Sequence, residues 1–433
     1  MMPRTPYALP GRVAAAAAAL VTAGLCLTPG PAAAAARVAA DHVLFSFSGA
    51  NGAGPLTGVI TGPHGVLYGT TVFGGRHGNG TVFSLTPKGS GYTERVLVSF
   101  GGAAGSRPDG IVADAHGDLF GTTTIGGAAG AGVVFELVPG RSGRYTERVL
   151  HSFGTGVVND GLQPAGTPVL DAAADVFGVT QFGGTGGQGV VYEMKHSASG
   201  FTPQVRYSFA STGGQPQAGV TMASNGALYG TLYGFGQVNQ DGTVFRIQLG
   251  KTGAVYTPLY NFAGGTDGAN PFGALTVDNH TGVIYGTTQY GGSRRGIGNG
   301  TVFALTPHGS GYTERVLHAL GATHGAGFAP EGTLLHEANG DLIGTASLGG
   351  IKCRGIGCGT IFELAPAGTR YTFRVIYHFT GPPDGADPQW SGLAPGPGGT
   401  LIGTTRSGGT SRTCADGGPG GVLGCGTVYQ ITP

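Results

Sequence analysis

The sequence predicts an all-β fold, a seven-bladed β-propeller with four antiparallel strands in each blade. Three observations lead to it: the composition, a unit that recurs seven times, and ends of the repeat pattern that complement each other. Glycine accounts for 89 of 433 residues and charged residues for only 10%. The glycines separate short runs rich in Val, Ile, Thr, Phe and Tyr without a Gly-X-Y period. Such punctuation is typical of many short strands joined by tight turns, and it excludes collagen.

Residues 1–36 are expected to form a signal peptide. Val13 to Leu27 is an unbroken run of apolar and small residues, too short for a membrane span, and small residues near Ala36 or Ala40 offer cleavage positions. An uncleaved anchor stays open as an alternative. Cleavage removes two of the 23 basic residues and none of the 22 acidic ones, so no global field attracts nucleic acid or an anionic membrane. We therefore expect an exported protein, periplasmic or extracellular, with no membrane span in its mature chain.

The recurring unit contains four short strand-like segments. Leu-Tyr-Gly-Thr-Thr at 67–71 recurs at a mean spacing of about 56 residues, near the length of a kelch-type blade. Its seven glycines are Gly69, Gly121, Gly178, Gly230, Gly286, Gly344 and Gly403. Segments like 80–83, 95–100 and 110–114 recur with it. Four strands per unit is the composition of a propeller blade.

The ends of the repeat pattern favour a closed ring. The mature chain opens with the fourth strand of a unit, Val43 to Ser48, and stops just after the third strand of the last unit. In a ring the N-terminal strand completes the last blade and leaves no unpaired edge, whereas an open array gains nothing from this arrangement. We expect residues 42–433 to form a single domain of this kind.

Most aromatic residues recur at fixed positions of the unit. They end the third and fourth strands, where they are large enough to fill the space between neighbouring sheets. The small Gly-Thr-Thr segment is expected at crowded positions between blades. Most of these aromatic residues are therefore expected to be core residues and not a row of side chains that stack on bases or sugars.

The run Gly-Thr-Val-Phe-x-Leu-Thr-Pro at 80–87 and 300–307, with Asp267-Gly-Ala-Asn-Pro271, resembles the bacterial GloVer tandem repeats. These were named after Gloeobacter and Verrucomicrobia and occur in exported choice-of-anchor proteins. The resemblance covers about residues 42–433 and implies no established activity and no catalytic residues. Family members often carry a C-terminal surface anchor, and this chain stops at the last blade strand. We therefore expect release into periplasm or medium.

The mature cysteines lie in the loops between the second and third strands of the last two units. Cys358 and Cys425 occupy the same repeat position, immediately before Gly-Thr, and Cys353 and Cys414 precede them. In an exported chain the matched pairs predict two disulfides within these loops, Cys353–Cys358 and Cys414–Cys425. A zinc site of four thiolates is the alternative, but its spacings fit poorly. No metal or other cofactor is expected.

Basic residues in these loops are unevenly distributed among the units. Units five, six, seven and one carry them, and a closed ring makes these units contiguous. The candidate ligand-binding residues are Arg294, Arg295, Lys352, Arg354, Arg412 and Arg76, together with the only tryptophan, Trp390. An arc of this kind could hold a carboxylated or sulfated glycan or another anionic partner. Solvated loop charge is the open alternative for the arc, and half-buried packing for Trp390.

The sequence contains no pattern that identifies an enzyme. Aspartates recur before the first strand, including Asp109, Asp267 and Asp387, and Asp-Gly and Asp-x-x-Pro are typical of turns. No Ser-His-Asp order, cysteine nucleophile or phosphate loop is present, so catalytic residues stay unknown. We expect a monomeric, non-enzymatic binding or surface-interaction module for an extracellular glycan or protein. An extracellular polysaccharide lyase or hydrolase, or a purely structural envelope protein, are the alternatives, and acids with shifted pKa values at the channel mouth would favour the enzyme.

Overall fold

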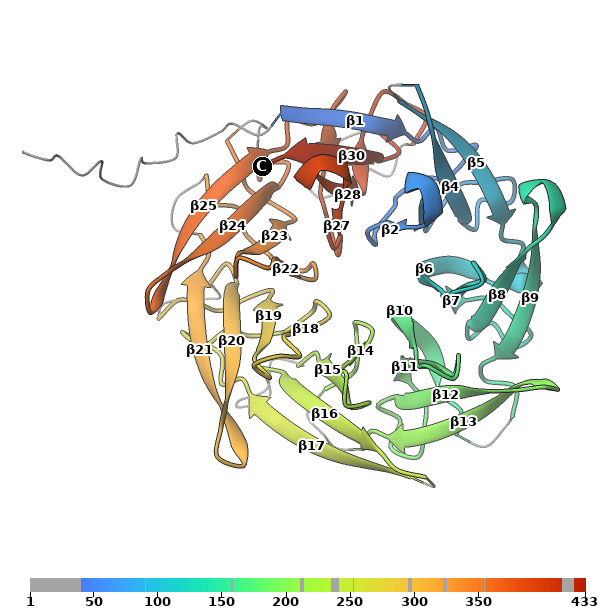
Figure 1. Cartoon of the computed structure of the whole chain (residues 1–433), viewed down its shortest axis with the longest axis horizontal. Helices are drawn as coiled ribbons and strands as arrows, with labels where there is room; N and C mark the ends of the chain where they lie inside the picture. The colour runs from blue at the N-terminus through green and yellow to red at the C-terminus, as the bar shows by residue number, and fades with distance from the viewer. Residues whose placement is uncertain are drawn as a thin grey trace, which may run out of the picture. The chain divides into compact units, whose positions relative to one another are not determined.

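Seven four-stranded antiparallel sheets are arranged in a ring around a central axis (Figure 1). The computed structural model describes residues 40–433, except 90, 157–158, 211–213, 235–240, 252, 295–297, 322–324, 352, 354 and 415–423. The expected signal peptide, residues 1–36, lies outside the described residues. The architecture confirms the predicted seven-bladed propeller.

The strands of each blade follow one another from the centre of the ring outward, except in blade 7 (Figure 1). Blade 1 contains β2 (Ile60–Thr61), β3 (Leu67–Thr71), β4 (Thr81–Lys88) and β5 (Gly91–Ser99). Blade 2 contains β6 (Ser106–Ala113), β7 (Leu119–Ile125), β8 (Val133–Pro139) and β9 (Tyr145–Ser152). Blade 3 contains β10 (Leu162–Leu170), β11 (Val176–Phe182), β12 (Val190–Ser197) and β13 (Gly200–Ser208).

The inner strands of blades 4 to 6, like those of blades 1 and 7, are only two residues long. Blade 4 contains β14 (Thr221–Met222), β15 (Leu228–Leu232), β16 (Thr243–Leu249) and β17 (Ala254–Asn261). Blade 5 contains β18 (Thr276–Val277), β19 (Ile284–Thr288), β20 (Thr301–His308) and β21 (Gly311–Ala319). Blade 6 contains β22 (Leu335–His336), β23 (Leu342–Ala346), β24 (Thr360–Ala367) and β25 (Arg370–His378). Four short 3₁₀ turns are η1 (Pro63–Gly65), η2 (Gly102–Ala104), η3 (Arg141–Gly143) and η4 (Pro397–Gly399).

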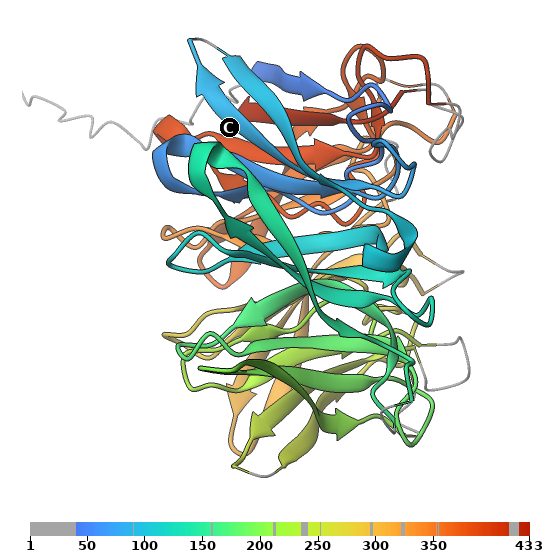
Figure 2. The ribbon, with the colours of Figure 1, turned by 90° about the vertical axis from the view of Figure 1, so that its right-hand side faces the viewer.

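Blade 7 is completed by the N-terminal strand. It contains β27 (Ala394–Pro395), β28 (Leu401–Thr405), β30 (Thr427–Thr432) and β1 (Ala40–Ser46). The pairing of β1 with β30 runs from Ala40 opposite Thr432 to Ser46 opposite Thr427, and both views show the two strands side by side (Figures 1 and 2). A small two-stranded ribbon, β26 (Gly385–Ala386) with β29 (Ser407–Gly408), accompanies this blade. The predicted ring closure is confirmed.

The glycine of the second strand is required by an aromatic ring of the same blade. Gly286 pairs with Phe303 across the sheet, and a Cβ on Gly286 would lie 2.5 Å from the Cζ atom of that ring. The same Gly–aromatic pair occurs in every blade, from Gly69 with Phe83 to Gly403 with Tyr429. The crowding expected between blades therefore arises, at this position, within each blade.

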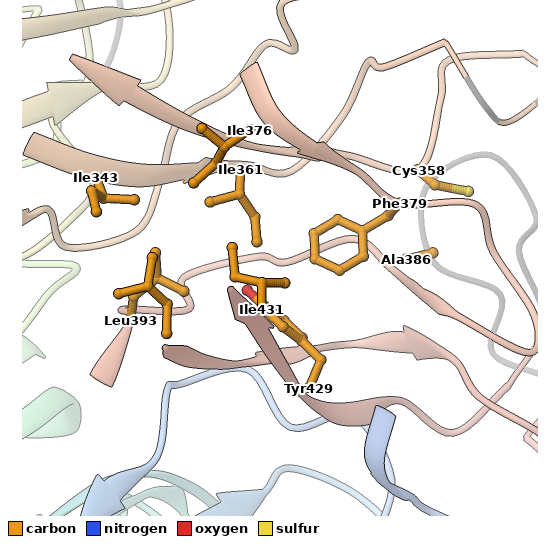
Figure 3. Packing of buried hydrophobic residues seen from close by; sticks show 10 residues of the cluster. Ile343, Cys358, Ile361, Ile376, Phe379, Ala386, Leu393, Tyr429 and Ile431 are labelled. Carbon is orange, nitrogen blue, oxygen red and sulfur yellow. The ribbon is translucent and has the colours of Figure 1, made fainter. Parts of the chain in front are cut away.

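Aromatic pairs also join neighbouring blades. The ring that follows each fourth strand packs edge-on or tilted against the third-strand ring of the next blade, as Phe262 does on Phe303 with centroids 5.2 Å apart. Figure 3 shows the corresponding contact between blades 6 and 7, where Phe379 lies on Tyr429 beside Ile361 and Ile431. Leu320 replaces the ring at one interface and packs in the same cluster as Phe362. These contacts confirm that the recurring aromatics form the core.

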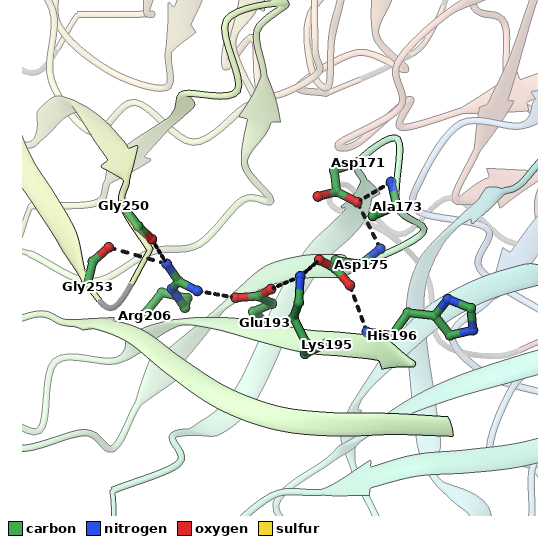
Figure 4. A network of polar contacts seen from close by, with 9 residues as sticks. All are labelled: Asp171, Ala173, Asp175, Glu193, Lys195, His196, Arg206, Gly250 and Gly253. Atoms are coloured by element: carbon green, nitrogen blue, oxygen red, sulfur yellow. Dashed lines mark hydrogen bonds and ion pairs between the residues drawn. The ribbon is translucent and has the colours of Figure 1, made fainter. Parts of the chain in front are cut away.

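Polar contacts connect blades at the outer strands. Arg206 of blade 3 reaches the β16–β17 turn of blade 4, where it donates to the carbonyls of Gly250 and Gly253 (Figure 4). Arg206 also pairs with the buried carboxylate of Glu193 at 2.5 Å. Because a buried charge is costly unless it is paired and hydrogen-bonded, Arg206 stabilises Glu193 and links blade 3 to blade 4.

Candidate functional site

A repeated backbone geometry carries the chain into each inner strand. A proline opens this segment in every blade, and the residue before it commonly has a positive φ, 58° at Arg107 and 59° at Asp387. The N–H of that residue bonds back to the preceding blade, as Asp387 does to the carbonyl of Cys358 at 2.9 Å. The proline itself packs on a glycine of that blade, such as Pro388 on Gly359. The backbone of this segment is therefore similar in each blade, whatever side chain follows the proline.

The residues just after these prolines line a cavity of about 220 Å³ on the axis of the ring, here called the channel hollow. All seven blades contribute to its wall: Thr57, Asp109, Gly166, Gln217, Phe272, Glu331 and Trp390. Glycines bring the inner strands close together, and a Cβ on Gly166 would lie 1.9 Å from the backbone nitrogen of Gly219. The channel is therefore narrow, and each blade contributes a different residue to its wall.

A second cavity, of about 300 Å³, adjoins the channel hollow on the side where the second strands end. We call it the mouth hollow. It shares Asp109, Gln217, Phe272 and Trp390 with the channel hollow. Its own wall adds two cationic side chains, Arg107 and Arg406, and the amides of Gln181 and Gln389. Apolar surfaces alternate here with a few polar groups, the usual constitution of a small-ligand site.

An aromatic pair from two distant blades forms the centre of both hollows. Trp390 of blade 7 stacks on Phe272 of blade 5, with centroids 5.2 Å and planes 16° apart. Three residues separate proline from glycine in blade 7, Pro388 and Gly392, whereas one residue does so in blades 2, 3, 5 and 6. Trp390 has a φ of 54°, which is costly for a bulky side chain, and its buried Nε1 finds no hydrogen-bond partner among the described residues.

Glu331 is a buried carboxylate of the channel wall, with 4% of its surface exposed. It accepts hydrogen bonds from Ser347 at 3.0 Å and from the amide of Gln289, to which Tyr233 donates at 3.5 Å. Burial raises its pKa, while these hydrogen bonds and the nearby Arg406 act against the rise. The result is a polar network along blades 4 to 7.

Asp387 lies beneath Arg406 and is 3% exposed. Its carboxylate is 3.8 Å from the Arg406 guanidinium, and neither oxygen accepts a hydrogen bond from a described residue. Burial raises the pKa of Asp387 to about 7; Arg406 lowers it and Glu331 raises it further. Arg406 also donates to Gln389 at 3.1 Å, so its position at the mouth is fixed from two sides.

Asp109 shows that the expected turn role was wrong for two of the recurring aspartates. It accepts a hydrogen bond at 2.8 Å from the N–H of Gly166 in the next blade, and it lines both hollows. Burial raises its pKa and this hydrogen bond lowers it. Asp387 likewise faces a cation rather than its own turn, whereas Asp267 does bond to the loop N–H of Ala263 at 2.9 Å, as expected.

The predicted ligand residues do not form one group in the structure. Trp390 lines the channel and mouth hollows, half-buried, whereas Arg76, Arg294 and Arg412 are exposed and line neither. Arg295, Lys352 and Arg354 lie outside the described residues. The anion-binding arc stays a prediction. Both predicted disulfides are confirmed, Cys353–Cys358 and Cys414–Cys425.

The wall residues Phe272, Glu331, Gln389 and Arg406 were missed by sequence reasoning. Their signal is variation at a fixed repeat position. The residue after the proline differs in almost every unit, namely Leu56, Asp109, Ala165, Gln217, Phe272, Glu331 and Gln389. Architecture cannot require such variation, so it marks the surface where the ring is specialised.

The chain belongs to the Gloeobacter/Verrucomicrobia repeat family, whose model matches residues 34–231 and 142–297. No curated protein matches the sequence significantly. Among solved structures, an oxidoreductase described as a glucose dehydrogenase from Thermus thermophilus is 19% identical, with a TM-score of 0.43, over 75% of this chain and 96% of that one. A PQQ-bound aldose sugar dehydrogenase from Streptomyces coelicolor is 14% identical, with a TM-score of 0.46, over 78% and 97%. This likeness is confined to the fold and carries no argument about activity.

The described part of the chain contains no helix of the length and hydropathy needed to cross a membrane. Within the same residues, no three His, Cys, Asp or Glu side chains gather in a way that could hold a metal ion.

Proposed function

We propose that this protein is an exported carbohydrate-binding protein that holds a sugar unit in the channel and mouth hollows. The observation that carries the proposal is the stacked pair of Trp390 and Phe272, which faces two hollows whose remaining walls contain the amides of Gln181, Gln217 and Gln389 and the carboxylates of Asp109 and Glu331. A sugar ring presents C–H groups on its faces and hydroxyls at its edge. An aromatic platform suits the faces, and polar groups around it suit the edge.

The polar groups have the hydrogen-bonding capacity that hydroxyls need. Each sugar hydroxyl both donates and accepts, and the amides of Gln217 and Gln181 do the same. Asp109 adds an acceptor at the wall that both hollows share. The strained backbone of Trp390 fits a residue kept for binding rather than for packing.

Intrinsic fluorescence tests the proposal directly, because Trp390 is the only tryptophan of the chain. Titration with neutral and acidic saccharides should change its emission in a saturable way. Trp390→Ala and Phe272→Ala, followed by calorimetry, should weaken binding by at least about thirtyfold, as loss of a buried aromatic contact of about 2 kcal/mol predicts.

A matched control removes a stacked ring elsewhere. Tyr207 and Tyr256 stack on the outer strands, with centroids 5.2 Å and planes 10° apart, far along the blade from either hollow. Tyr207→Ala should leave saccharide affinity unchanged. If a broad saccharide panel produces neither a fluorescence change nor heat with the unmodified protein, the proposed function is wrong.

A glycoside hydrolase is the second candidate, and one observation favours it. Asp109 and Glu331 line the same hollow, and burial raises the pKa of both carboxyls, which suits a general acid. Incubation with the glycans that bind separates the two candidates. Products that disappear in both Asp109→Asn and Glu331→Gln would identify the enzyme, whereas intact glycan after long incubation would support the binding protein.

A further inference from the structure

A third cavity, of about 420 Å³, lies between the loops of blades 7 and 1, and we call it the outer hollow. Gly49 and Ala53, after β1, form one side, and Thr413 and Cys414 of the β29–β30 loop form the other. Phe73 and Arg406 belong to its wall and to the wall of the mouth hollow. The outer hollow therefore continues the site away from the axis.

The three cavities follow one another from the axis to the border of blades 7 and 1, and each shares wall residues with the next. The channel and mouth hollows meet at Trp390 and Phe272, and the mouth and outer hollows meet at Phe73 and Arg406. Each shared set of wall residues includes at least one aromatic ring, Trp390 and Phe272 in the first and Phe73 in the second. Repeated aromatic rings suit the successive units of a sugar chain, whereas a single monosaccharide would fill only the first hollow.

This series of cavities becomes cationic toward its outer end. Arg406 lines both outer cavities, and Arg107 lies over the Phe73 ring at 5.6 Å without an ion pair to any described residue. Arg76 lies between the wall residues Gly74 and Gly78 in the chain. Arg412 directly precedes Thr413, and both arginines are exposed. The described wall of the outer hollow contains no carboxylate.

We propose that the ligand is an anionic oligosaccharide that enters the ring by one end. Its terminal unit occupies the channel hollow against Trp390, and the following units leave through the mouth and outer hollows, with their carboxylate or sulfate groups at Arg107 and Arg406. This proposal rests on the proposed carbohydrate binding and names the class and direction of the ligand. Arginine forks match both kinds of oxyanion in geometry.

The Cys414–Cys425 disulfide contributes Cys414 to the wall of the outer hollow. The bond closes the β29–β30 loop next to Gly49, and the hydroxyl of Thr413 donates to the carbonyl of Ser48 at 2.8 Å. Thr413, in the described first part of this loop, is thereby attached to the segment that follows β1. The other disulfide, Cys353–Cys358 in blade 6, lines neither the mouth nor the outer hollow and provides a matched control.

The experiment compares oligogalacturonides of one to four units with cello-oligosaccharides of equal length, by fluorescence of Trp390. We expect the galacturonide tetramer to bind at least about tenfold more tightly than the monomer, a gain of about 1.4 kcal/mol, and the neutral series to show a much smaller gain. Sulfated carrageenan oligosaccharides form a third arm. The acidic arm with the larger gain identifies the oxyanion.

Variants of the protein test which residues cause the gain in affinity from monomer to tetramer. Cys414→Ser with Cys425→Ser should reduce the tetramer-to-monomer ratio to about one, whereas Cys353→Ser with Cys358→Ser should preserve it. Arg107→Asn, which tolerates the positive φ at this position, should reduce the ratio in the acidic series alone. Circular dichroism of each variant checks that the blades are formed.

The possible results distinguish the proposed anionic oligosaccharide from the proposed carbohydrate binding on which it rests. A monomer that binds without any gain from chain length, or an equal gain for neutral and acidic chains, overturns the anionic chain and leaves the sugar site standing. A length gain that survives loss of Cys414 and Cys425 overturns the path through the outer hollow. Absence of any response to all three series overturns the proposed function, and the anionic chain with it.

Discussion

The sheets of the propeller and the wall of its channel follow opposite rules. In the sheets the same pair recurs in every blade, a glycine of the second strand beneath an aromatic of the third, such as Gly286 and Phe303. On the channel wall the equivalent positions carry Asp109, Phe272 and Glu331. Both regions share one repeat and one backbone geometry. The difference teaches that packing keeps the sheets uniform, while the channel positions are free to diversify and therefore hold the specific chemistry.

The largest effect should follow from opening the ring. Deletion of residues 40–46 removes β1, leaves β30 as an unpaired edge and exposes Leu44's partners in blades 7 and 1. Because open edges pair with other chains, we expect aggregation and a fall in melting temperature of roughly 10 °C or more. Size-exclusion chromatography with light scattering and a thermal melt provide the measurement. A monomeric variant with the original melting curve would show that closure is dispensable.

A single methyl group in the uniform region should have the next largest effect. Gly286→Ala would place Cβ 2.5 Å from Phe303 and 2.9 Å from Leu275, in a fully packed core. Overpacking of this kind costs about 1–3 kcal/mol. Gly91→Ala is the matched control, because a Cβ there meets nothing within 4 Å. Urea denaturation should separate the two variants clearly, and equal midpoints would contradict the account of the Gly–aromatic pair.

The free energy of unfolding should also depend on pH, because two carboxyl groups of the outer strands titrate at unusual pH. Burial raises the pKa of Glu147 and of Glu314 on the outer strands to about 7, and Asp267 adds to the rise at Glu314. Between about pH 4.5 and pH 7 the folded state then binds more protons than the unfolded state at these groups, so the free energy of unfolding falls as pH rises and is level above that range.

The double variant Glu147→Gln with Glu314→Gln isolates this contribution. Its free energy of unfolding, from urea curves between pH 4 and pH 8, should depend less on pH than that of the unmodified protein. The two curves should converge at the acidic end and separate toward neutral pH. Parallel curves would mean that these carboxyls titrate normally.

The smallest expected effect belongs to the channel. Asp387 faces Arg406 and Glu331, and burial raises its pKa to about 7. Protonation below pH 7 removes the counter-charge of Arg406, so an anionic saccharide should bind about threefold more tightly at pH 6 than at pH 8. Fluorescence titration at both values measures it. Asp387→Asn should bind with the higher affinity at both, and an unchanged pH dependence in this variant would exclude Asp387 as its source.

The sequence predicted most of the uniform region, because uniformity is itself a sequence signal. Recurring Gly-Thr-Thr and Gly-Thr-Val-Phe segments gave the strands, and the shared position of Cys358 and Cys425 gave both disulfides. The ends of the pattern gave the pairing of β1 with β30. The crowding at Gly286 was assigned to the wrong neighbour, because only the register of the sheet shows which ring lies above it.

The channel could be predicted only in part. Trp390 was recognised because it is unique, but its partner Phe272 comes from two blades earlier in the chain and approaches it only across the closed ring. Arg406 and Asp387 look like ordinary loop charges in the sequence. The burial of Asp387 and its 3.8 Å separation from Arg406 depend on how the segment before β27 folds over the end of β28. Variation of the residue after the proline was the available sequence signal. It identifies which positions line the channel, but not what those side chains bind.

The pairing of β1 with β30 also determines when the molecule can become complete. Ala40 is made long before Thr432, its partner in the ladder, so almost the whole chain must emerge before the ring can close. Contacts of such sequence separation form slowly, and until they do the waiting blades present two open edges. Local hairpins such as β4–β5 can assemble early. The synthesis of β30 therefore sets the earliest time at which the ring can close. A chain that ends before residue 427 contains the strands of blades 1 to 6 but lacks β30, the strand that pairs with β1.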